Sequence, residues 1–229
     1  MKLAALFSGG KDSTYAIYLA KKLGHSVDVL LTLYPYSDES HLLHYPNIHF
    51  TRLQSESMKI PQLIEKITSE NPESESEKLN KLISLAKENY SIEGIVHGGI
   101  LSEYQKNNFS LICEKNHLEI ISPLWNKDPE SYMKELLNEN FEYIISTVSS
   151  DGLNDSWLGQ IIDMNRLDKL QKLQKKFSFN LNFEGGEAET FVINCPLFEK
   201  PLLIQDSTTV WDGYRGRFEI LEAKLENNA

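Results

Sequence analysis

The 229-residue sequence predicts an α/β fold, in which a five-stranded parallel sheet with helices on both faces is followed by a smaller α+β domain. Three observations predict this fold. Apolar runs of strand length alternate with amphipathic helical segments through the first 125 residues. Small-residue turns follow two of these runs, at 8–13 and 98–99. After residue 125 the order of elements becomes mixed and then rich in β-type residues, which indicates a second domain.

The elements of the first domain, residues 1–125, follow from the spacing of its apolar residues. Residues 1–7 are an almost continuous apolar run, typical of a buried parallel strand, and the helical pattern after Thr14 ends at Gly24. Further strands are expected at 27–33, 47–53, 94–97 and 118–121, and further helices at 61–68, 79–90 and 102–116. Residues 38–45 are expected to form a short helix or turn, and 70–78 a solvated acidic connector. Right-handed crossovers make this domain Rossmann-like.

The second domain, residues 126–229, is expected to mix helices with an antiparallel sheet. Helices are predicted at 129–140 and 158–176, and strands at 143–148, 190–193, 202–210 and 215–224. Asp212 and Gly213 form a turn signal between the last two strands, so these are expected to pair as a hairpin.

Composition excludes several classes of protein. A net charge of −10 and a pI near 5.1 argue against a large nucleic-acid partner. No apolar run approaches membrane-spanning length and the chain begins directly with strand residues, so we expect a cytoplasmic protein with no membrane partner. Cys113 and Cys195 are too far apart to form a C-x-x-C pair, and His41, His44 and His49 fit no zinc spacing.

The segment Ser8-Gly9-Gly10-Lys11-Asp12-Ser13, called here the phosphate loop, joins the first strand to the first helix. Backbone N–H groups and the positive end of the helix dipole meet in such a turn and bind anions. The two glycines allow close approach of a bulky anion, and the serine hydroxyls and Lys11 add donors and charge. The spacing fits neither G-x-x-x-x-G-K-[ST] nor G-x-G-x-x-G.

Gly98 and Gly99 form a second glycine-rich strand end. In open α/β sheets, ligands bind outside the carboxyl ends of the strands, where the strand order reverses. We therefore expect these glycines to approach the bound anion from the side opposite the phosphate loop.

Residues 184–190, Glu-Gly-Gly-Glu-Ala-Glu-Thr, form the second unusual segment, called here the acidic turn. In an extended chain Glu187 and Glu189 project to the same face, and like charges placed together are unfavourable unless a cation faces them. The residues alone fit two interpretations, an exposed acidic hairpin or a pocket for a cation or metal.

The string S-G-G-K-D-S after an N-terminal strand resembles the PP-loop of the ATP pyrophosphatase superfamily, which implies a HUP-type sheet and cleavage of ATP to AMP and pyrophosphate. With G-G-I-L-S-E-Y-Q at 98–105, P-L-W at 123–125, E-G-G-E-A-E-T at 184–190 and C-P-L-F at 195–198, the chain looks like the diphthine–ammonia ligase family over nearly its full length. Ala188 departs from the pattern, because an aromatic residue is common there in relatives, and this affects the expected shape of the pocket.

The resemblance implies amidation of the diphthine carboxylate on translation elongation factor 2, through an acyl-adenylate, with ATP and Mg²⁺. Free ammonium is the expected nitrogen source, because both domains are already assigned and no glutaminase domain is left. A homodimer is compatible with the sequence. Implied catalytic residues are Lys11, Asp12 and Glu187, with Asp12 also a ligand of Mg²⁺. Nucleotide contacts are implied for the two glycine-rich turns: Ser8, Gly9, Gly10, Lys11, Asp12, Ser13, Gly98 and Gly99. Substrate contacts are implied for Tyr104, Trp125, Glu184, Gly185, Gly186, Glu187, Glu189 and Thr190.

Two other functions share part of this pattern. A tRNA-modifying PP-loop enzyme would have the same phosphate loop. It would also be expected to have a basic face and, for several thiolases, paired cysteines, and the sequence shows neither feature. A non-catalytic nucleotide-binding sensor on the same fold would need fewer of the groups present in residues 8–13.

Overall fold

The computed structural model describes residues 1–34, 47–67 and 72–227, and the chain divides into two compact units. The first unit comprises Met1–Ser8, Asp12–Ile48 and Lys59–Trp125. The second comprises Gly9–Lys11, His49–Met58 and Asn126–Ala229. Two short N-terminal stretches therefore belong, by their contacts, to the second unit.

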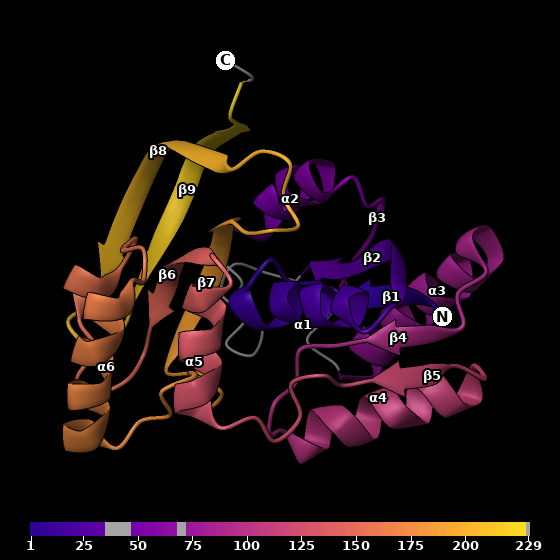
Figure 1. Ribbon diagram of the computed structural model, residues 1–229, viewed down its shortest axis with the longest axis horizontal. Coiled ribbons are helices and arrows are strands. Elements are labelled where there is room, and N and C mark those ends of the chain that lie inside the picture. Colours follow the sequence, from indigo (N-terminus) through magenta and orange to yellow (C-terminus); the bar gives the residue numbers. More distant parts are fainter. Residues whose placement is uncertain (35–46, 68–71, 228–229) are drawn as a thin grey trace. The chain divides into compact units, whose positions relative to one another are not determined.

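The first unit is built on a parallel sheet of β1 (Lys2–Leu6), β2 (Ser26–Tyr34), β3 (Gln62–Lys66), β4 (Gly94–Val96) and β5 (Glu119–Ile121). The strand order is β3-β2-β1-β4-β5 (Figure 1). The predicted α/β fold with a five-stranded parallel sheet is confirmed.

Helices α1 (Lys11–Lys22), α3 (Pro72–Tyr90) and α4 (Glu103–Lys115) connect these strands. One apolar cluster joins Ala4, Val29 and Ile95 of the sheet to buried side chains of α3 and α4. Successive strand residues point to opposite faces, so the fully buried Leu3 and Ala5 face the other way. The connection from β1 to β2 crosses the sheet in the direction opposite to the connections from β3 to β4 and from β4 to β5. Because all of these crossovers are right-handed, α1 lies on that second face.

The strand order reverses between β1 and β4, since β2 and β3 follow β1 on one side and β4 and β5 lie on the other. This is the topological switch point, where the two flanking connections leave a crevice at the carboxyl ends of the strands. The chain segments that leave β1 and β4 at this point are Phe7-Ser8 and His97-Gly98-Gly99.

Three sequence-based expectations for the first half of the chain were wrong. The strand expected at 47–53 is instead a 3₁₀ turn, η1 (Ile48–Phe50), followed by helix α2 (Thr51–Met58). The helix expected at 61–68 is instead strand β3, which pairs with β2 over its whole length. The connector expected at 70–78 is helical from Pro72 onward, with proline at a first-turn position that suits it. The segment expected at 38–45 lies outside the described residues.

The second unit combines a four-stranded antiparallel sheet with helices. Its elements are α2, α5 (Pro129–Asn138), β6 (Glu142–Val148), η2 (Asp155–Trp157), α6 (Met164–Phe177), β7 (Ala188–Asn194), β8 (Leu202–Trp211) and β9 (Gly216–Leu225). The strand order is β7-β6-β9-β8, and the predicted hairpin of β8 and β9 is confirmed. Phe50 and Leu53 pack against the apolar cluster of this sheet, which explains why residues 49–58 belong here.

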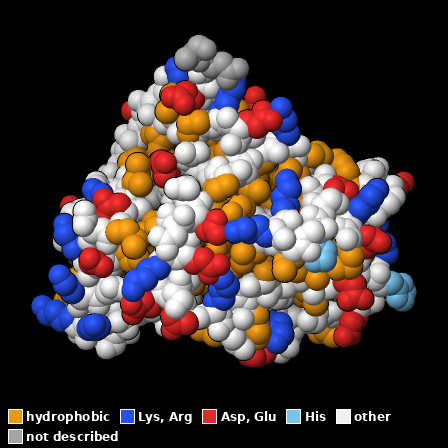
Figure 2. Space-filling model, in the orientation of Figure 1, with side chains coloured by type: hydrophobic (Ala, Val, Ile, Leu, Met, Phe, Trp, Pro, Cys, Tyr) orange, Lys and Arg blue, Asp and Glu red, His pale blue; other side chains and the backbone are white. Residues whose placement is uncertain are grey.

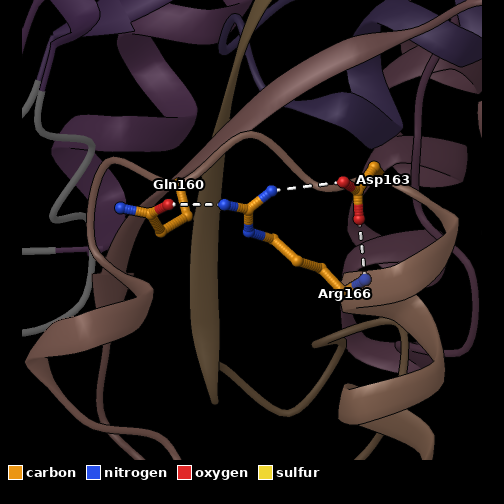
Figure 3. Close-up of polar contacts among 3 residues, drawn as sticks. All are labelled: Gln160, Asp163 and Arg166. Atoms are coloured by element: carbon orange, nitrogen blue, oxygen red, sulfur yellow. Dashed lines mark hydrogen bonds and ion pairs between the residues drawn. The ribbon is translucent and has the colours of Figure 1, made fainter.

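The helix expected from residue 158 begins only at Met164, because Asp163 caps it. The Asp163 carboxylate accepts a hydrogen bond from the backbone N–H of Arg166 at 2.7 Å, and Arg166 reaches back to Gln160 at 2.8 Å (Figure 3). Lys and Arg side chains over α6 are interspersed with Asp and Glu side chains (Figure 2). Within the described part of the chain, every helix is too short or too polar to cross a bilayer.

Candidate active site

In the first unit, the two serines at the ends of the phosphate loop contact each other. Ser13 Oγ accepts a hydrogen bond from the backbone N–H of Ser8 at 3.3 Å and lies 3.1 Å from Ser8 Oγ. Asp12 lies in the first turn of α1. The hydroxyl groups and the first turn of the helix are therefore held together at the carboxyl end of β1, where the positive end of the helix dipole favours an anion.

Gly98 touches this first helical turn. A Cβ atom at Gly98 would lie 2.5 Å from the backbone carbon of Asp12 and 2.7 Å from the backbone nitrogen of Ser13. Only glycine permits so close an approach between two backbones. The structure thus brings together two of the predicted nucleotide-binding segments, at the switch point of the sheet.

His97, which sequence reasoning did not single out, fixes the start of this glycine turn. It is buried, with only 2% of its surface exposed. Its Nδ1 accepts a hydrogen bond from the backbone N–H of Gly99 at 3.1 Å, and its Nε2 lies 2.6 Å from Ser122 Oγ. Burial, with a smaller contribution from the charge of Lys106, lowers the pKa of His97 to about 4. The ring is therefore neutral at pH 7, with its proton on Nε2.

In the second unit, residues 9–11 of the phosphate loop are held by β7 and the segment before it. The backbone N–H of Lys11 donates to Thr190 Oγ1 at 3.1 Å. Lys11 Nζ donates to the backbone oxygen of Asn182 at 2.8 Å and lies 5.4 Å from the ring centre of Phe183. Lys11 is only 2% exposed, so its charged group is surrounded by protein and lies near the Asn182 carbonyl and the Phe183 ring.

The Glu187 carboxylate has a clear local role in the acidic turn. Glu187 Oε1 accepts hydrogen bonds from the backbone N–H and the side-chain Nδ2 of Asn180, both at 2.8 Å, and Oε2 accepts from the backbone N–H of Gly185 at 2.9 Å. Glu187 precedes β7, whereas Glu189 lies in it and donates its backbone N–H to Thr147 Oγ1. The Glu187 carboxylate therefore shapes the turn that presents Glu184 and Glu189.

Trp125 and Tyr104 are the two aromatic residues expected to contact the substrate, and the structure describes the side chain of Trp125 only. The ring of Trp125 carries Lys106 Nζ at 4.0 Å from its centre, so this ring does accept a cation, from within its own unit. Tyr104 lies in α4, and its side chain is outside the described residues.

Neither cysteine is suited to nucleophilic or redox chemistry. Burial raises the pKa of Cys113 to about 11 and that of Cys195 to about 12, so both are thiols at neutral pH. Among the described residues, no three His, Cys, Asp or Glu side chains are grouped as a metal site. A metal here would need phosphate oxygens as additional ligands, which is how Mg²⁺ is commonly bound.

The fold, the switch point and the loop S-G-G-K-D-S together define an α/β protein of the PP-loop ATP pyrophosphatase class. Residues 1–120 match the sequence model of the diphthamide synthase N-terminal domain, and residues 128–225 match that of the diphthamide synthase C-terminal domain. The chain belongs to the diphthamide synthase family, a family of ATP-dependent ligases.

Curated relatives are similar over most of the chain. The diphthine–ammonia ligases of Bos taurus and Homo sapiens are each 33% identical over 228 residues, which covers 92% of this chain and 85% of each relative. That of Schizosaccharomyces pombe is 32% identical over 225 residues and covers 92% of this chain but 37% of the relative. A solved structure described as a predicted subunit of tRNA methyltransferase from Methanocaldococcus jannaschii has a TM-score of 0.41 and 15% identity, covering 86% of this chain and 98% of that one, a likeness too weak to bear on function.

Proposed function

We propose that this protein amidates the diphthine carboxylate on translation elongation factor 2, using ATP and free ammonium and releasing AMP and pyrophosphate. The observation that carries the proposal is the family match over both units, together with the phosphate loop at the switch point of the first sheet. A carboxylate is a poor acyl donor, and transfer of AMP to it provides a good leaving group for attack by ammonia. We propose a cytoplasmic enzyme with no direct nucleic-acid partner, consistent with its net charge of −10.

The nucleotide is proposed to bind at the phosphate loop and the Gly98-Gly99 turn. Gly98 has no side chain and lies against the backbone of Asp12, and the hydroxyl groups of Ser8 and Ser13 lie together. Both features suit a polyphosphate bound at a helix N-terminus. Lys11 is proposed to offset the charge that develops on the departing pyrophosphate.

Asp12 is proposed to hold Mg²⁺ together with phosphate oxygens of ATP. A carboxylate in the first turn of α1 is the donor type that Mg²⁺ prefers, and the bound ion would neutralise phosphate charge.

The acidic turn is proposed to face the cationic end of diphthine. Glu184, Glu189 and Thr190 are proposed to contact the substrate, with Gly185 and Gly186 allowing close approach. Glu187 is proposed to act by holding the turn, because its carboxylate accepts hydrogen bonds from Asn180 and Gly185. Trp125 and Tyr104 are proposed as further substrate contacts, Trp125 by a cation–π contact of the kind it makes with Lys106.

The reaction can be tested with purified protein, Mg-ATP, ammonium and elongation factor 2 that carries diphthine. Mass spectrometry is expected to show conversion of the carboxylate to the carboxamide, with AMP and pyrophosphate formed in equal amounts. Omission of ammonium is expected to stop the reaction, and glutamine is not expected to replace it. Formation of ADP and phosphate, or a strict requirement for glutamine, would overturn the proposal.

Two substitutions in the acidic turn separate substrate contact from support of the turn. Glu184→Gln is expected to raise the KM for the diphthine-bearing factor at least ~10-fold, by loss of charge. Glu187→Gln replaces an acceptor oxygen with an amide that cannot accept from Gly185, so it is expected to lower the free energy of unfolding by about 1 kcal/mol as well. A Glu187→Gln variant of unchanged stability that has lost kcat would instead identify Glu187 as a direct catalytic group.

A further inference from the structure

Gln54 is a fully buried polar side chain in the second unit, on helix α2. A buried amide is costly unless it is hydrogen-bonded, so a glutamine at 0% exposure calls for an explanation. The unit that contains Gln54 also contains Gly9–Lys11 of the phosphate loop.

The Gln54 amide connects this loop to β7. Its Nε2 donates to the backbone oxygen of Gly9 at 3.0 Å and to that of Val192 at 2.7 Å. The backbone N–H of Val192 donates to the same Gly9 oxygen at 3.0 Å. The orientation of the amide is settled by these neighbours, since both are carbonyl acceptors. Its Oε1 has no hydrogen-bond partner among the described residues.

Two donors thus fix the carbonyl of Gly9, and this sets the orientation of the next peptide N–H. A trans peptide is planar, with its C=O and N–H on opposite sides. Because the Gly9 oxygen faces Gln54 and Val192, the N–H of Gly10 points away from both. Backbone N–H groups of a glycine-rich turn are the groups that bind phosphate, so their orientation matters for such a site.

Gly9 and Gln54 also fit each other sterically. Gly9 has φ +80°, and a Cβ atom there would lie 2.4 Å from Gln54 Oε1 and 2.9 Å from Thr51 Cγ2. The glutamine therefore occupies the space that any side chain at position 9 would need. The next contact along the loop, from the Lys11 N–H to Thr190 Oγ1, is made on the same strand, β7.

We propose that Gln54 is a positioning residue for ATP binding, which acts by fixing the Gly9-Gly10 peptide of the phosphate loop. Its amide acts through the backbone oxygens of Gly9 and Val192. The inference rests on the proposed function, because it takes residues 8–13 as the site of ATP phosphates.

The test measures ATP affinity by calorimetry and the KM for ATP, with Gln54→Met as the main variant. Methionine is unbranched and of similar length but cannot donate to either carbonyl. Its ATP affinity is expected to fall at least ~10-fold. The ATP affinity of Gln54→Glu is expected to lie between those of Gln54→Met and the parent, because a buried carboxyl group is protonated and can donate one hydrogen bond.

Ser57→Ala is the matched control. Ser57 lies on the same helix and exchanges hydrogen bonds with the backbone of Lys200, at 2.6 Å and 3.1 Å, so its loss also destabilises this unit. Its ATP affinity is expected to stay within about twofold of the parent. If Gln54→Met or Gln54→Glu lowers the unfolding midpoint as Ser57→Ala does but binds ATP as the parent does, Gln54 is structural only and the inference fails. Failure of the parent itself to bind ATP would refute the proposed function instead.

Discussion

Replacing Gly98 with alanine is expected to weaken ATP binding at least ~100-fold, or about 2.7 kcal/mol. The added Cβ would lie 2.5 Å from the backbone carbon of Asp12 and 2.7 Å from its oxygen, and these are backbone atoms that cannot rotate away. Overpacking of this kind costs about 1–3 kcal/mol and is relieved only by movement of the backbone. The movement would displace the first turn of α1, where the phosphates are proposed to bind. Calorimetric titration with ATP measures the effect.

Gly94→Ala provides the matched control, because it introduces a similar clash at the amino end of β4, the strand whose carboxyl end leads to Gly98. A Cβ at Gly94 would lie 2.8 Å from the backbone oxygen of Glu119. This variant is expected to lower the unfolding midpoint while its folded molecules bind ATP as the parent does. Equal losses of ATP affinity in the two variants would mean that the Gly98 effect reflects general damage to the sheet.

Acidification from pH 6.5 to pH 4 is expected to remove about 3 kcal/mol of stability through His97 alone. The pKa of His97 is about 4 in the folded chain, against the ordinary histidine value of 6.5 that applies once the chain unfolds, so the unfolded chain binds the extra proton first as the pH falls. Stability is therefore complete above pH 6.5, decreases through this window and levels off below pH 4. A charged ring would place a second N–H at Nδ1, facing the N–H of Gly99 that it now accepts from.

Urea unfolding at a series of pH values tests this expectation, with His97→Asn as the control. The asparagine oxygen can take the place of Nδ1 as an acceptor for Gly99, but it does not titrate. The difference in unfolding free energy between the parent and this variant is expected to change by about 3 kcal/mol between pH 6.5 and pH 4. A constant difference would show that the pKa of His97 is the same in the folded and the unfolded chain.

Local signals along the sequence were sufficient to predict the core of the first unit. The apolar run of β1, the glycine pair at 9–10 and the helical pattern after Thr14 lie next to one another in the chain, and each favours the same fold. The second glycine pair, 98–99, could be placed at the same edge of the sheet as the end of β1, because the topology of parallel sheets brings strand ends together.

Residues 47–53 and 61–66 were misassigned because short apolar runs do not distinguish a strand from a buried helix. Phe50 and Leu53 have β-type character, but they are helical and pack against the cluster of Ile144 and Phe191 in the second unit. The packing partner decides the conformation here, and it lies about a hundred residues further along the chain.

The roles of Gln54, Asn182 and Glu187 could not be read from the sequence for a related reason. Each depends on a partner supplied by another part of the chain or by a folded turn: the Gly9 carbonyl for Gln54, the Lys11 ammonium for Asn182 and the Asn180 N–H for Glu187. A lone glutamine on a helix has no pattern that reveals such a partner.

The assignment of residues 9–11 and 49–58 to the second unit has a consequence for biosynthesis. These segments leave the ribosome early, whereas β7, which receives them, begins at Ala188. Until that strand has been synthesised, Gly9 lacks the Val192 N–H and Lys11 lacks the Thr190 hydroxyl. The phosphate loop therefore reaches its final conformation only after residues 188–194 have been synthesised.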